Sequence, residues 1–143
     1  MLYSLIDANE KYFYLSEIEG DAILFYRYNK KPCYKSVMEV LLRMLNAFNY
    51  KLIELEKYLG TKINMSLKFI LHHGKFSRYN IKYFNKLYGE PIIEAHRLLK
   101  NEYAKYPSYI LLTNSFLYAI EYSDHNACKN KIYIPEVGLF HYL

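Results

Sequence analysis

The amino-acid sequence predicts an α+β fold in which a mixed, partly antiparallel sheet is covered by helices. Segments rich in aromatic and aliphatic residues alternate with segments of helical periodicity. One unbroken apolar stripe recurs about every 3.6 residues from Val37 to Leu59, as in an amphipathic helix. The chain has 143 residues, the usual size of one domain, and contains no linker, repeat or low-complexity tract. We therefore predict a single domain over residues 1–143.

The first predicted element is a β-hairpin with strands at 12–18 and 22–28. Both segments are rich in aromatic and aliphatic residues, and Glu19-Gly20-Asp21 separates them. A glycine accepts the positive φ of a tight turn, and an acidic neighbour is common there. The pattern predicts two antiparallel strands joined by a short turn.

The strongest signal predicts a long helix at 37–59. Pro32 suits the entry to this helix, and Gly60 suits a left-handed C-cap. Glu39 and Arg43 are spaced to form an i,i+4 ion pair. The stripe that we expect to face the core consists of Val37, Leu41, Met44, Phe48, Leu52, Leu55 and Leu59.

The second half of the chain predicts shorter elements. Pro91 suits the first turn of a helix, and Thr113 or Asn114 suits an N-cap. The predicted elements are a strand at 67–72, a turn at 73–75, a strand at 79–84, a helix at 89–101, a strand at 109–112, a helix ending at Tyr122, and a hairpin of 132–134 with 139–142.

Composition excludes several classes of protein. Hydrophobic residues make up 52% of the chain, with 18 Tyr and 8 Phe, which disfavours disorder. Cys33 and Cys128 share no metal or redox spacing, so nothing in the sequence indicates a disulfide scaffold. The apolar runs are far shorter than the roughly 18 residues that a membrane-spanning helix needs. We expect a cytoplasmic protein with no membrane partner.

Basic and aromatic residues are interleaved between residues 75 and 88. The net charge of +5 and this pattern are compatible with nucleic-acid binding, because cations contact phosphates while rings stack on bases. Ordinary strand alternation gives much of the same pattern, and no RNA-binding motif accompanies it. Nucleic-acid binding is therefore an alternative and not the leading hypothesis. The residues are Lys75, Phe76, Arg78, Tyr79, Lys82, Tyr83, Lys86 and Tyr88.

Four segments occur in an order that resembles the class III nucleotide cyclases. They are SEIEGDAILFY (16–26), LKFILHHGKF (67–76), GEPIIEAHRLLKN (89–101) and YILLTNSFL (109–117). More narrowly, SEIEGDA with AHRLLKN and LLT is similar to a bacterial cyclase-like group, domain-of-unknown-function family 2652. The resemblance implies a ferredoxin-like, cyclase-type sheet and homodimerisation or pairing with a similar domain.

The resemblance also implies site residues. Asp21 falls on the second metal-binding aspartate of the cyclases, which hold two Mg²⁺ or Mn²⁺ ions, and Arg97 falls on their transition-state arginine. Glu17 and Lys86 fall on the two base-recognition positions. Ile93 replaces the transition-state asparagine and cannot donate a hydrogen bond.

The first cyclase strand and its aspartate are absent, since the sequence starts inside what resembles the helix before the hairpin. Removing that strand predicts a gap in the sheet, which would close by direct pairing of its neighbours, by a strand from a second subunit, or in a longer chain. We therefore predict a non-catalytic cyclase-homology domain that binds a nucleotide-like ligand or a protein partner. The first alternative is a purine nucleotide cyclase whose metal-binding strand lies upstream.

Other candidate groups have simpler explanations. Glu17 and Glu19 alternate on one strand and would share a face, which suits metal or base binding and equally a solvated sheet surface. His72 and His73 are predicted within or beside a strand, where they would point to opposite faces and could not easily chelate one metal.

Overall fold

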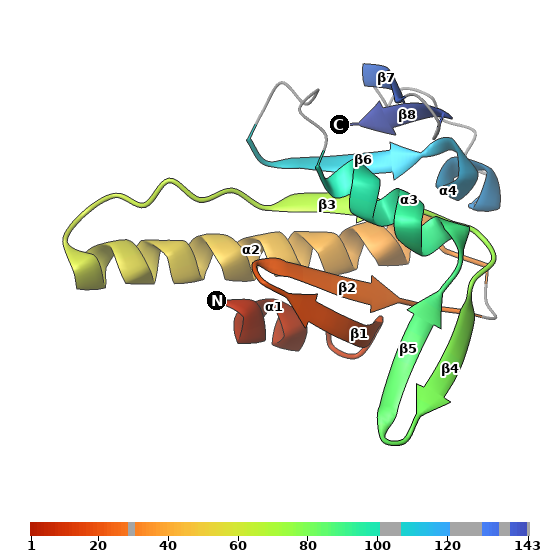
Figure 1. The fold of residues 1–143 in the computed structure, drawn as a ribbon. Helices are drawn as coiled ribbons and strands as arrows, with labels where there is room; N and C mark the ends of the chain where they lie inside the picture. Colours follow the sequence, from red (N-terminus) through yellow and green to blue (C-terminus); the bar gives the residue numbers. More distant parts are fainter. Residues whose placement is uncertain (29–30, 101–106, 121–129, 135–137, 143) are drawn as a thin grey trace. The chain divides into compact units, whose positions relative to one another are not determined.

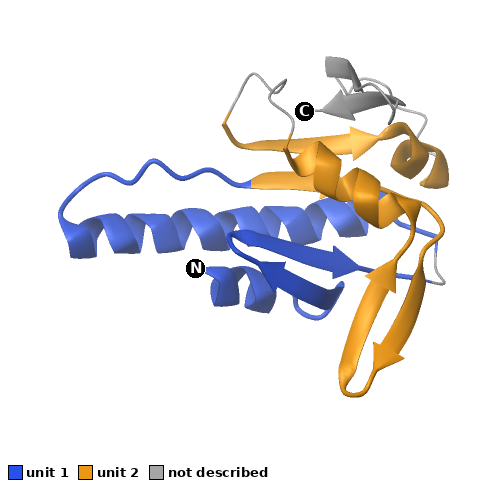
Figure 2. Ribbon diagram, in the orientation of Figure 1, with its two compact units in different colours: residues 1–67 blue, residues 68–143 orange. Residues whose placement is uncertain are grey.

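The computed structural model describes residues 1–28, 31–100, 107–120, 130–134 and 138–142, the last two ranges by their backbone alone. The chain divides into two units, residues 1–67 and 68–143 (Figure 2). The first unit contains α1 (Leu2–Ala8), β1 (Tyr14–Glu19), β2 (Ala22–Tyr26) and α2 (Tyr34–Leu59). The second contains β3 (Lys68–Leu71), β4 (Ser77–Ile81), β5 (Phe84–Tyr88), α3 (Glu90–Leu99), β6 (Tyr109–Thr113), α4 (Asn114–Ala119), β7 (Asn130–Ile134) and β8 (Gly138–Tyr142) (Figure 1).

The predicted mixed α+β class is confirmed, but the described strands form three sheets. β1 and β2 make one antiparallel pair, β4 and β5 make another, and the third sheet has the order β3-β6-β8-β7. The prediction that the 12–28 hairpin pairs beside the strands at 67–84 is therefore wrong. β3 takes β6 as its parallel partner, from Lys68 opposite Tyr109 to Leu71 opposite Leu112. Among the strands whose side chains the structure describes, β6 is the most buried in the second unit.

In the first unit, α2 packs against α1. The predicted cap is confirmed, because Gly60 has φ 69° and its N–H donates to the Glu56 carbonyl at 2.9 Å. The predicted stripe is buried only in its first half, whereas Leu59 is 56% exposed. A seven-residue helix is about 10 Å long and α2 about 39 Å, so α1 can cover only part of α2. The buried residues of α2 are Val37, Val40, Leu41, Met44 and Phe48.

In the second unit, α3 packs against β3 while α4 packs against β6 and β8. β3 and β6 are parallel, and the other pairs in this sheet are antiparallel. Leu111 and Leu112 of β6 are fully buried, and so is Leu98 of α3. Ile92, Ala95 and Leu99 of α3 are half-buried. The closing hairpin is confirmed as β7 and β8, while Asn101, Tyr122 and Cys128 lie outside the described residues.

The predicted single strand at 79–84 is wrong, because a hairpin occupies this segment. β4 and β5 pair from Ser77 opposite Tyr88 to Ile81 opposite Phe84, with a two-residue turn at Lys82-Tyr83. Lys82 has φ 54°, although a hairpin turn with positive φ at its first central residue normally has glycine there. The turn therefore lacks the residue that would have revealed it in the sequence.

None of the described helices is both long enough and apolar enough to span a membrane.

Candidate functional site

The first unit carries two of the four predicted site residues, both on the β1–β2 hairpin. Asp21 is exposed in the turn, next to Gly20 with φ 59°. Glu17 is half-buried on β1, opposite Leu24. A register shift lies between Leu15 and Glu17. The geometry of Asp21 is what turn formation requires.

The second unit carries the other two predicted residues on its surface. Lys86 is exposed on β5, opposite Tyr79, and Arg97 is exposed on α3. Ile93 is 53% exposed and lies four residues before Arg97, so the two share one face of α3. An exposed isoleucine beside the arginine provides no donor to a phosphate, whereas the guanidinium provides a planar fork of donors.

A polar network within the second unit was not predicted from the sequence. The His72 Nδ1 atom lies 2.9 Å from the Thr113 hydroxyl oxygen. The His72 Nε2 atom is hydrogen-bonded to a carboxylate oxygen of Glu94. Because a carboxylate only accepts, Nε2 carries a proton and donates it to Glu94. The His72 side chain is 7% exposed, so these contacts tie the end of β3 to α3 and β6.

The network contains the residue types of a catalytic triad, but its geometry suits a structural role. Thr113 is fully buried, and its hydroxyl oxygen accepts the Phe116 N–H at 3.2 Å as the N-cap of α4. A nucleophile must reach a substrate, and this hydroxyl cannot. The expectation that His72 and His73 point to opposite faces of a strand is wrong, since β3 ends at Leu71. The predicted capping role of Thr113 is confirmed.

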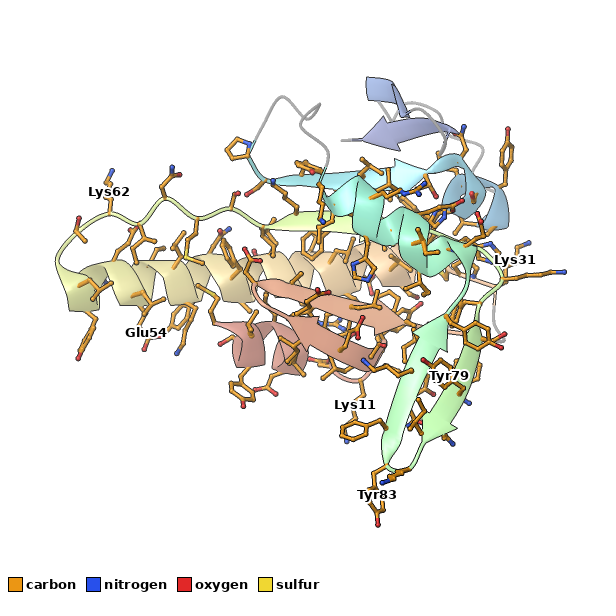
Figure 3. All side chains as sticks on the ribbon, viewed as in Figure 1. Lys11, Lys31, Glu54, Lys62, Tyr79 and Tyr83 are labelled. Atoms are coloured by element: carbon orange, nitrogen blue, oxygen red, sulfur yellow. The ribbon has the colours of Figure 1, made fainter. Side chains whose placement is uncertain are left out.

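The β4–β5 hairpin exposes an aromatic and apolar face. Residues directly opposite each other, and residues two apart along a strand, share a face. The exposed fractions are 42% for Tyr79, 55% for Ile81, 68% for Phe84 and 54% for Tyr88. Tyr83 stands at the tip of the hairpin and is 97% exposed (Figure 3). We call the face made by Tyr79, Ile81, Phe84, Lys86 and Tyr88 the aromatic face.

The segment that contains this hairpin is basic. Residues 68–89 contain five basic side chains and no acidic one, and all five are exposed. The opposite face of the hairpin pairs Arg78 with Leu87 and Asn80 with Asn85. The five basic residues are Lys68, Lys75, Arg78, Lys82 and Lys86.

The base of the hairpin is closed by two glycines. Gly89 has φ 136°, and a Cβ there would lie 3.2 Å from the Lys75 carbonyl oxygen. A Cβ on Gly74 would collide with the ring of Pro91. The segments entering and leaving the hairpin therefore approach each other more closely than side chains would permit.

A family model described as protein of unknown function (DUF2652) matches residues 1–107. No curated protein and no solved structure matches the chain. The matched segment includes the four predicted site residues and the whole β4–β5 hairpin.

Proposed function

The chain belongs to the family described as protein of unknown function (DUF2652), and we propose that it is a non-catalytic binding domain that takes an anionic ligand on the β4–β5 hairpin. The observation that carries this proposal is the exposed aromatic face within a segment that has five basic residues and no acidic residue. Large exposed apolar patches on soluble domains commonly mark interaction sites, and a basic surround favours anions.

The construction of the hairpin supports a binding role. Isolated two-stranded hairpins are marginally stable in water, and among the described strands β4 and β5 hydrogen-bond only to each other. The close approaches at Gly74 and Gly89 fix the base of the hairpin, and the Tyr79 and Tyr88 rings meet edge-on with centroids 5.3 Å apart. These contacts would hold the aromatic face in place before a ligand arrives, which reduces the entropic cost of binding.

The resemblance to class III cyclases supports an anionic, nucleotide-like ligand but not turnover. Two-metal phosphoryl chemistry needs carboxylates that hold both ions, and Asp21 is an exposed turn residue. We expect no cyclase activity with ATP or GTP in the presence of Mg²⁺ or Mn²⁺. Steady turnover that Asp21→Ala abolishes would instead support the alternative, a purine nucleotide cyclase with a further metal-binding strand.

Binding of labelled inorganic polyphosphate to the full chain tests the proposal. The double variant Lys75→Glu/Lys82→Glu should weaken the affinity at least about tenfold, because it reverses two charges beside the aromatic face. The control Lys57→Glu/Lys62→Glu makes the same change in net charge at two exposed lysines in or beside α2. An equal loss in both variants would show that net charge alone attracts the anion and would contradict a site on the hairpin.

A further inference from the structure

We infer that the ligand of the β4–β5 hairpin is single-stranded nucleic acid, whose bases stack on the aromatic face while the surrounding cations contact its phosphates. This inference rests on the proposed function and names the class of its ligand. In this inference the three exposed rings contact the ligand directly, whereas a simple anion would contact only the cations.

The aromatic face supplies rings that a base can reach. Tyr79, Phe84 and Tyr88 expose 42%, 68% and 54% of their surface, and they alternate with residues of the opposite face. Base–aromatic stacking tolerates any sequence, because every base has a π-face. A base can stack only when it is unstacked from its neighbours, so the surface selects single strands over duplexes.

The charge of the segment 68–89 argues against other occupants. A second copy that docked the same face isologously would bring two segments with five basic residues and no acidic residue together, and like charges across an interface are repulsive. A lipid surface would attract the cations, but it offers no planar groups on which the exposed rings could stack. Phosphates spaced along a polymer satisfy the cations, and the attached bases satisfy the rings.

The tyrosines and the phenylalanine can be tested separately from the charges. Fluorescence anisotropy of the full chain with a labelled, mixed-sequence DNA strand of about 12 nucleotides gives the affinity at fixed salt. Tyr79→Leu, Phe84→Leu and Tyr88→Leu keep an apolar side chain but remove the ring. Each should weaken binding of the strand by about 5- to 150-fold, the range for one stacked base, and should leave polyphosphate binding unchanged.

The control Tyr50→Leu/Tyr58→Leu removes two rings from α2 that are 73% and 86% exposed, and it should leave the DNA affinity unchanged. Circular dichroism checks that each variant retains its fold. Duplex DNA bound as tightly as the single strand would overturn the inference, as would ring variants with unchanged DNA affinity. If polyphosphate still responds to Lys75→Glu/Lys82→Glu in that case, the proposed function survives without the inference. Loss of the DNA signal together with ring-dependent binding to anionic vesicles, or with ring-dependent dimerisation, would also overturn it.

Discussion

At the scale of single residues, polar side chains fix the turn after α1 and join the end of α1 to α2. Asn9 is 3% exposed, and its amide donates to the Phe13 carbonyl at 2.8 Å and accepts the Phe13 N–H at 2.9 Å. These two hydrogen bonds stabilise the turn after α1, where Glu10 and Lys11 both have positive φ. Arg43 donates to the Ala8 carbonyl and lies 3.8 Å from Glu10, so the predicted Glu39–Arg43 pair is wrong.

Thr113→Val should lower the free energy of unfolding by about 1–3 kcal/mol, because the Phe116 N–H and the His72 ring lose their shared oxygen in a fully buried site. Urea denaturation of the full chain measures this difference. Thr113→Ser keeps the oxygen and should recover most of the loss. Equal destabilisation by valine and serine would show that the methyl group, and not the hydrogen bonds, stabilises this site.

Cys33 is expected to be an unusually reactive thiol. It is the exposed N-cap of α2, and hydrogen bonds from Ser36, first from its side chain and then from its backbone, lower the pKa of the thiol below its usual value. The thiolate is the reactive form, so alkylation by iodoacetamide should accelerate at a lower pH than for a model thiol.

The alkylation rate against pH, measured in a Cys128→Ser background, reports this pKa. Ser36→Ala removes the largest cause of the shift and should move the profile to higher pH. A profile that Ser36→Ala leaves in place would contradict the assigned cause.

At the scale of elements, local signals fix the helices and the first hairpin. The apolar period of α2, its left-handed Gly60 and the position of Pro91 in the first turn of α3 each depend on residues within a few positions of one another. The β4–β5 hairpin shows the limit of such signals. Its turn has Lys82 at φ 54° where glycine is usual, so the sequence resembles one continuous strand.

Leu41→Asp should be severely destabilising, by about 4 kcal/mol or more, because it places an unpaired charge where Leu41 is 4% exposed. The matched control is Leu42→Asp on the next position of α2, where the leucine is 51% exposed. This control should change the free energy of unfolding by less than about 1 kcal/mol. Comparable losses in thermal or chemical denaturation would contradict the assignment of the buried face of α2.

At the scale of the whole molecule, strand pairing differs from the cyclase-type sheet that the sequence suggested. The β1–β2 pair and β3 belong to separate sheets, so direct closure of the expected gap is wrong. β3 forms one edge of the four-stranded sheet, and its segment Phe69 to Leu71 is apolar. An apolar strand at the edge of a sheet has backbone N–H and C=O groups that can pair with a strand of another chain.

We predict that the chain forms a homodimer through addition of a strand at β3. Light scattering should give a mass that approaches twice 17.2 kDa as concentration rises. Hydrogen exchange should then protect the β3 amides more strongly in the dimer than in dilute protein. A monomer at every concentration, or protection confined to other strands, would contradict strand addition.

The sequence by itself determined the α+β class, α2 and its C-cap, the β1–β2 hairpin, and an N-cap of α4 at Thr113 or Asn114, of which the structure has Thr113. Each depends on backbone conformation or periodicity over a few residues. Only the tertiary structure decided the pairing of β3 with β6, the partial burial of α2, and the contacts of His72 across 22 and 41 residues. These features depend on which apolar strands pair and which apolar surfaces pack together, and several similar candidates occur in the chain. The choice between these candidates depends on long-range packing, so the spacing of residues along the sequence does not predict it.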